Sequence, residues 1–365
     1  MSLDLFSPIT LGDLEFPNRI AIAPMCQYSA DDGSATDWHL QHWMSMALSG
    51  AGMITIEMTN VERRGRITHG CMGLYSDSNE AAAARTLAAA RRVAAPGAKF
   101  GIQIAHAGRK ASAKRPWEGG GPLGPQEDPW PTVSASAIPY AEGWHVPHAL
   151  EEDEIEAMVG RFVKAARRAE RAGFDFIELH SAHGYLLHQF LSPLSNRRSD
   201  RWGGSLENRM RFPLEVARQV VKAVPKLMVG ARISVTDWVN GGLTVEEGIE
   251  VARAYKEAGL KYLCCSSGGT SPLQKLPTGK GYQVHLAEAV RQGAGIATRA
   301  VGMINDPELA QSIIADDRAD MVAIARPYLA DPRWPWRAAA VTGNTVHVAP
   351  QLARSAHLIK EWVAA

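Results

Sequence analysis

Short apolar runs alternate with amphipathic stretches along almost the whole chain. Runs typical of buried β-strands occupy residues 19–24, 53–58, 100–104, 174–179, 227–233, 262–265, 296–301 and 321–325. Stretches typical of helices lie between them, at 38–48, 78–95, 151–172, 206–223, 245–258, 284–292 and 307–314. Strands that alternate with helices form parallel βαβ units, and eight such strands can close on themselves. The pattern therefore predicts an α/β fold, a TIM (β/α)8 barrel.

Two segments fall outside this alternation. Residues 6–16 carry Gly12 and Asp13 between apolar flanks, which predicts an N-terminal hairpin before the first barrel strand. Residues 115–148 are rich in Pro, Gly and Trp and lack periodicity, so we expect a long loop after the third strand that covers the rim of the barrel. No linker is apparent, and we predict a single domain over residues 1–365 with a C-terminal tail from about residue 342.

Charge and composition exclude several classes of function. The net charge of +1 gives no electrostatic footprint for nucleic acid or an anionic membrane. No apolar run approaches the ~18 residues of a membrane span, and the first residues lack the pattern of a signal peptide, so we expect a cytoplasmic protein. The four cysteines show no metal-binding spacing, and no metal site is predicted. Cys264 and Cys265 are expected to be small core residues, whereas Cys26 lies just past the first strand.

The ends of the predicted strands carry chemical groups that a barrel would bring to one mouth. His180, His183 and Tyr185 follow the fourth strand. Two imidazoles can hydrogen-bond one oxygen, and a nearby phenol can pass a proton, which together would polarise a carbonyl or nitro group and protonate the adjacent carbon. A strand-end histidine is also often structural, and His-x-x-His pairs bind metals, although no third ligand stands nearby. These residues alone leave those alternatives open.

Other strand ends point to a phosphate-bearing cofactor. Barrels bind phosphate after strands seven and eight, where this chain has Val301-Gly302 and Ala325-Arg326. Gln103 offers both a donor and an acceptor to an imide edge. Arg232, on an apolar strand, needs an anionic partner, which could be a reduced flavin ring or a carboxylate in a buried salt bridge. FMN fits these residues better than a sugar phosphate or pyridoxal phosphate does.

Several motifs resemble the Old Yellow Enzyme family of FMN-dependent ene-reductases, in its thermophilic-like branch. They are APMCQY at 23–28, GRIT at 65–68, GIQIAHAGRK at 101–110, ELHSAHGYLL at 178–187, LSPLSN at 191–196, WGGSLENR at 202–209 and GYQV at 281–284. The loop RPWE at 115–118 is similar to the xenobiotic-reductase subgroup. The resemblance runs from about residue 5 to residue 332.

The resemblance implies a role for each matching position. His180 and His183 would bind the activating oxygen of the substrate, Tyr28 would flank it, and Tyr185 would donate the proton. Cys26 would lie near the flavin and tune its potential. The positions that would contact FMN are Ala23, Pro24, Met25, Cys26, Asn60, Gln103, Arg232, Val301, Gly302, Ala325 and Arg326. Asn60 departs from the usual Ala of relatives, and Ala325 departs from a common Gly.

The implied activity is a ping-pong reduction of C=C bonds in enones, enals, nitroalkenes and maleimides, with NADPH or NADH as co-substrate. Rival hypotheses are a dihydrouridine-synthase-like enzyme, which the neutral charge disfavours, and a dienoyl-CoA reductase barrel, which would need a missing cysteine cluster. A non-catalytic flavin sensor would lack the His–His–Tyr set. The tail also resembles the family segment that lends an arginine to a neighbouring subunit, which would make Arg354 a substrate contact in a homodimer or homotetramer. The alternative is a solvated tail arginine.

Overall fold

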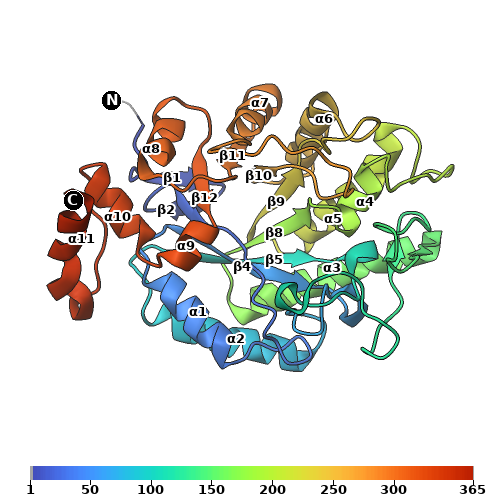
Figure 1. Ribbon diagram of the computed structural model, residues 1–365, viewed down its shortest axis with the longest axis horizontal. Helices are drawn as coiled ribbons and strands as arrows, with labels where there is room; N and C mark the ends of the chain where they lie inside the picture. Colours follow the sequence, from blue (N-terminus) through green and yellow to red (C-terminus); the bar gives the residue numbers. More distant parts are fainter. Residues whose placement is uncertain (1–2, 365) are drawn as a thin grey trace.

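Eight parallel strands form a closed barrel in the computed structural model, which describes residues 3–364. The strands are β3 (Ile20–Ile22), β4 (Met53–Asn60), β5 (Lys99–Ala105), β8 (Phe176–Ser181), β9 (Met228–Ser234), β10 (Tyr262–Ser266), β11 (Ala297–Ala300) and β12 (Met321–Ile324). They pair in chain order, and β12 pairs with β3 to close the ring. The predicted TIM barrel is confirmed (Figure 1).

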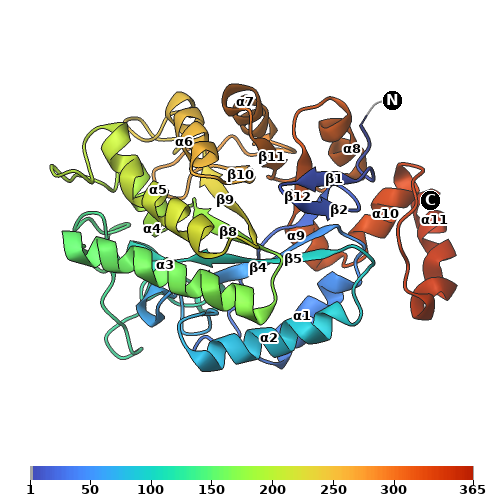
Figure 2. The ribbon, with the colours of Figure 1, turned by 180° about the vertical axis from the view of Figure 1, so that it is seen from behind.

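Helices pack around the outside of the barrel. The main ones are α1 (Asp37–Ala47), α2 (Asp77–Arg91), α3 (Glu152–Ala172), α5 (Leu206–Ala223), α6 (Val245–Glu257), α7 (Val284–Ala294), α8 (Pro307–Ala315) and α10 (Trp334–Val341). Neighbours in the chain are neighbours in space, and Figure 2 shows α3 and α5 side by side. Helix α3 illustrates how sequence sets this arrangement, because its apolar residues, including Ile155 and Phe162, form one buried face and Gly173 ends it with φ +94°.

The N-terminal hairpin closes the amino-terminal end of the barrel. Its strands β1 (Ile9–Leu11) and β2 (Leu14–Phe16) pair in antiparallel fashion, as predicted. Phe16 lies 6.3 Å, ring to ring, from Phe176, the first residue of β8. The same apolar cluster contains the first residues of β4, β9, β10 and β12. Since this end is filled by side chains, only the carboxyl-terminal mouth is left for a ligand.

Some boundaries and elements differ from the sequence predictions. β8 extends to Ser181, so His180 belongs to the strand, and Asn60 is the last residue of β4. The 115–148 loop contains a 3-10 turn, Pro116–Glu118, and the two-residue strands β6 (Val133–Ser134) and β7 (His148–Ala149). These pieces are too short to produce a periodic signal in the sequence.

The segments that follow β8 and β12 add further short helices. They are α4 (Leu186–Leu191), α9 (Arg326–Ala330) and, after α10, the 3-10 turn Pro350–Ser355 and α11 (Ala356–Ala364). Helices α10 and α11 stand at the same end of the molecule as the N-terminus in both views (Figures 1 and 2). Within the described residues, no helix combines the length and apolar character needed to cross a bilayer.

Candidate active site

A cavity of about 420 Å³ opens at the carboxyl-terminal mouth of the barrel. Seven of the residues singled out from the sequence line it: Pro24, His183, Arg232, Val301, Gly302, Ala325 and Arg326. They come from the ends of β3, β8, β9, β11 and β12, which are far apart in the chain and meet only because the barrel closes. Ala23, Met25, Cys26, Tyr28, Asn60, Gln103, His180, Tyr185 and Arg354 do not line this cavity.

His180 lies next to His183, which lines this cavity, and is a buried, neutral imidazole. Its ring lies 5.2 Å from that of His183 and 4.8 Å from that of Tyr185. Burial, together with the positive charge of Arg232, lowers its pKa well below the ordinary value of 6.5. The backbone N–H of Ala182 donates to Nδ1 at 3.3 Å, so in the neutral ring the proton resides on Nε2. His180 can therefore donate a hydrogen bond without carrying charge.

His183 is held by contacts from two other strands, β9 and β10, and from the 3-10 turn Gly108–Lys110. Its backbone N–H donates to Ser234 Oγ at 3.0 Å, and its carbonyl accepts from Lys110 Nζ at 2.9 Å. Its Nε2 lies 2.7 Å from Ser266 Oγ. The residue adopts φ +56°, a conformation that non-glycine residues rarely accept without such support. Burial and the charge of Arg232 also lower the pKa of His183 well below its ordinary value.

The glycines beside His183 allow two loops to approach very closely. A Cβ on Gly269 would lie 2.4 Å from the Cα of His183, and a Cβ on Gly184 would lie 2.2 Å from the carbonyl oxygen of Gly269. Lys110 Nζ bridges the same two loops, because it also donates to the Gly269 carbonyl at 3.0 Å. These contacts fix the direction of the His183 imidazole.

Tyr185, Cys26 and Tyr28 gather on the side of the mouth formed by β3 and β4. Tyr185 and Cys26 pack on one small apolar cluster with Met58. Burial raises the pKa of the Tyr185 phenol well above 10, so its proton is retained at neutral pH. Burial also raises the pKa values of the Cys26 thiol and the Tyr28 phenol. Tyr28 packs edge-on against Trp117 of the long loop at 5.9 Å.

The opposite side of the cavity suits an anionic, ring-bearing ligand. Arg232 forms no ion pair with any described residue, and its Nε is buried without a hydrogen-bond partner. The alternative of a buried salt bridge is therefore not found. Gly302 has φ +118°, and a Cβ there would lie 2.7 Å from Gln283 Nε2, so only glycine leaves the backbone accessible. Arg326 is exposed at the cavity and offers a fork for a phosphate.

Gln103 and Asn60 are almost fully buried beside these groups. Gln103 Nε2 donates to Glu178 Oε1 at 2.8 Å inside the barrel. Asn60 Nδ2 donates to the Met72 carbonyl at 2.8 Å, and its Oδ1 is buried without a partner. Arg354, in contrast, is exposed in the 3-10 turn that precedes α11.

Sequence reasoning missed several cavity residues: Ser266, Ser267, Gln274, Tyr282, Gln283, Met303 and Asn305. Gln283 braces the turn after β11, since its Nε2 donates to the Val301 carbonyl at 3.0 Å while Ser267 Oγ donates to its Oε1 at 2.5 Å. The signal was present in the motif GYQV at 281–284, to which no role was assigned. Lys110 was missed as well, although it lies within a quoted motif.

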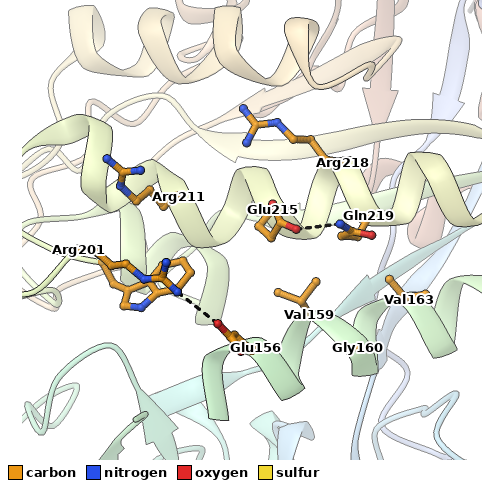
Figure 3. Close-up of a pocket in the computed structure, with 10 residues that line it drawn as sticks. Glu156, Val159, Gly160, Val163, Arg201, Arg211, Glu215, Arg218 and Gln219 are labelled. Atoms are coloured by element: carbon orange, nitrogen blue, oxygen red, sulfur yellow. Dashed lines mark hydrogen bonds and ion pairs between the residues drawn. The ribbon is translucent and has the colours of Figure 1, made fainter. Parts of the chain in front are cut away.

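A larger cavity of about 650 Å³ lies away from the mouth, between α3 and α5 (Figure 3). Its floor carries Val159 and Val163, and Arg201 pairs with Glu156 at 3.2 Å across one end. None of the residues predicted to be functional lines this groove. Size alone does not identify an active site, and the smaller cavity holds the convergent polar groups with perturbed pKa values.

The mouth of this barrel combines neutral imidazoles, a protonated phenol and an arginine without an ion-pair partner among the described residues, beside a turn that suits a phosphate group. These are the features of a flavin-dependent oxidoreductase. The chain belongs to the NADH:flavin oxidoreductase / NADH oxidase family, which matches residues 4–342. Its resemblance to the Old Yellow Enzyme group is thereby confirmed, and it is an NAD(P)H-dependent flavin oxidoreductase.

Relatives named as NADPH dehydrogenases align with almost the full length of this chain. An NADPH dehydrogenase of Listeria innocua is 40% identical over 356 residues, which is 96% of this chain and 98% of the relative. An NADPH dehydrogenase of Geobacillus sp. is 41% identical over 359 residues, or 97% and 99%. Among solved structures, morphinone reductase superposes with a TM-score of 0.76 at 30% identity and covers 96% of this chain and 93% of its own. A 2-naphthoyl-CoA reductase gives a TM-score of 0.83 at 26% identity, over 93% of this chain and 52% of that one.

Proposed function

We propose that the protein is an FMN-dependent ene-reductase that uses NADPH, or NADH, to reduce C=C bonds activated by a carbonyl or nitro group. The observation that carries the proposal is the set formed by His183, which lines the mouth cavity, and the adjoining rings of His180 and Tyr185. Two neutral N–H donors suit a carbonyl or nitro oxygen, and a phenol with a raised pKa suits proton donation to carbon.

FMN fits the groups that the mouth provides. Arg232 has a buried Nε without a partner, the turn at Gly302 exposes its backbone, and Arg326 adds a cation near that turn. The further contacts that we propose are Ala23, Pro24, Met25, Cys26, Asn60, Gln103, Val301 and Ala325. Bound FMN supplies the hydride chemistry, because it can accept a hydride from a nicotinamide and deliver one to an activated alkene.

The residues of the chain bind and polarise the alkene. His180 Nε2–H and an N–H of His183 would hold its activating oxygen, where negative charge develops as the β-carbon is reduced. Fixed donors of this kind contribute about 3–4 kcal/mol to the transition state. Tyr185 holds its proton until the α-carbon becomes basic, and Tyr28 flanks the substrate on the Trp117 side. Cys26, next to Tyr185, would tune the flavin.

We extend the proposal to a subunit interface formed by the tail from about residue 342, in a homodimer or homotetramer. Arg354 is exposed and forms no ion pair with any described residue, which leaves it available to the mouth of a neighbour. The tail would then belong to the single FMN-binding domain of residues 1–365 and complete the active site of the next subunit.

The experiment that tests the function begins with the flavin. The purified protein should release FMN, identified by chromatography and mass, and should be reduced by NADPH or NADH without oxygen. Arg232→Ala should lose FMN on gel filtration, whereas Arg218→Ala, an exposed arginine of α5, should retain it. A protein that cannot be loaded with FMN, or equal loss from both variants, would contradict the proposal.

A further inference from the structure

An ion pair crosses the inside of the barrel beneath the mouth. Glu178 of β8 and Arg299 of β11 are 0% and 1% exposed, and Arg299 Nη2 donates to Glu178 Oε2. Tyr262 Oη donates to the same oxygen at 2.9 Å. A buried ion pair costs desolvation, and apolar side chains of equal volume often stabilise a fold as well or better. Since the proposed mechanism does not use this pair, its presence suggests a separate role.

The remaining oxygen of Glu178 faces the side chain of Gln103. The two residues are direct partners in the pairing of β5 with β8, and Gln103 Nε2 donates to Glu178 Oε1 at 2.8 Å. A carboxylate paired with an arginine can only accept hydrogen bonds. The amide of Gln103 must therefore turn its NH₂ group toward Glu178, which directs Oε1 to the other edge of the planar amide. Oε1 makes no hydrogen bond with a described residue.

We propose that Glu178 is a positioning residue that fixes the amide orientation of Gln103, so that Gln103 presents an acceptor to the imide N–H of the flavin ring. The inference rests on the proposed function, because it assumes that FMN occupies the mouth. Arg299 keeps Glu178 ionised and in place, and Thr55 Oγ1 accepts from Arg299 Nη1 at 3.2 Å. The second N–H of the amide remains free for the carbonyl next to the imide.

Replacing Glu178 by Gln should reverse this orientation. Arg299 has only donors, so the amide oxygen of the new side chain must face it, and the new NH₂ group must face Gln103. Gln103 would then turn Oε1 toward position 178 and its NH₂ group toward the flavin. Two donors, the NH₂ group and the imide N–H, would then meet, and the hydrogen bond to the cofactor would be lost.

The test compares FMN with N3-methyl-FMN, which lacks the imide hydrogen. Apoprotein is titrated with each, and binding is measured by flavin fluorescence. The wild type should bind FMN roughly 10–100-fold more tightly than the methylated compound, in keeping with the loss of one buried hydrogen bond and the added methyl group. Glu178→Gln should bind FMN more weakly and discriminate clearly less, because the hydrogen bond is already absent. Tyr262→Phe is the matched control: it removes another hydrogen bond from Glu178, and it should discriminate as the wild type does.

The outcomes separate this inference from the proposed function. If Glu178→Gln does not fold because Arg299 is left unpaired, the double variant Glu178→Leu with Arg299→Met removes both charges and the acceptor that orients Gln103, and it should also discriminate less than the wild type. Equal discrimination in the wild type and in the folded Glu178 variants would overturn the positioning role while FMN binding stands. Failure of the wild type to bind FMN would overturn both.

Discussion

Removal of one oxygen atom, by Tyr185→Phe, separates the two halves of the proposed reaction. Alkene reduction should slow by roughly 10²–10⁴-fold, the usual contribution of a positioned general acid. Reduction of the flavin by nicotinamide should change by less than about twofold, because that half needs no proton from a side chain. The half-buried Tyr185 phenol, with its pKa raised well above 10, is the protonated donor near the mouth that this reasoning requires.

The structure also predicts the cost in stability. Tyr185 Oη makes no hydrogen bond to any described residue, so its removal should alter the free energy of unfolding by less than about 0.5 kcal/mol. Tyr255→Phe is the matched control. Its phenol donates to Ser181 Oγ at 2.7 Å, behind the strand that carries His180, so this variant should lose about 1 kcal/mol of stability and keep both half-reactions.

Anaerobic stopped-flow absorbance at the flavin band measures both halves in each variant, and denaturant unfolding measures stability. The reasoning is refuted if Tyr185→Phe slows both halves equally, or if Tyr255→Phe slows alkene reduction as much as Tyr185→Phe does.

Four further results are expected. The rate of the alkene half-reaction should stay constant as pH falls from 7 to about 6, because His180 and His183 have pKa values lowered by burial below 6.5 and are neutral throughout; an inflection near 6.5 would argue against neutral imidazoles. Between pH 7 and 9 the rate should change, because burial and Arg109 lower the pKa of Lys110, which tethers His183, to about 8; a rate unaltered up to pH 9 would contradict that link. Cys26→Ala should shift the flavin reduction potential without unfolding the protein, and an unaltered potential would make Cys26 a packing residue only. Arg354→Ala should raise KM for the alkene in an oligomer seen by light scattering, whereas a monomeric, fully active enzyme would show that Arg354 serves no neighbour.

The sequence predicted the barrel because each of its strands is a short apolar run bounded by an amphipathic helix. It also predicted which strand ends meet, since a closed parallel barrel gathers all of them at one mouth. Pro24, Arg232 and Gly302 line one cavity for this reason.

The polar pair inside the barrel could not be predicted in this way. Glu178 forms hydrogen bonds with Gln103, 75 residues away in the chain, and with Arg299, 121 residues away. Neither of these sequence separations corresponds to a local sequence pattern. In a strand buried on both faces, the sequence does not tell which residues point inward. Helix α11 of the tail was also missed, because it lies beyond the repeating strand–helix pattern that guided the prediction.

The central claim is tested most directly by a single-turnover experiment without oxygen. The protein is reduced with one equivalent of NADPH and mixed with 2-cyclohexenone or with cyclohexene, which has the same ring but no activating carbonyl. The proposed hydrogen bonds from His180 and His183 to the carbonyl oxygen predict rapid flavin reoxidation, with one equivalent of cyclohexanone, for the enone alone. A reduced protein that neither alkene reoxidises, or a flavin that returns its electrons only to oxygen, would contradict the account.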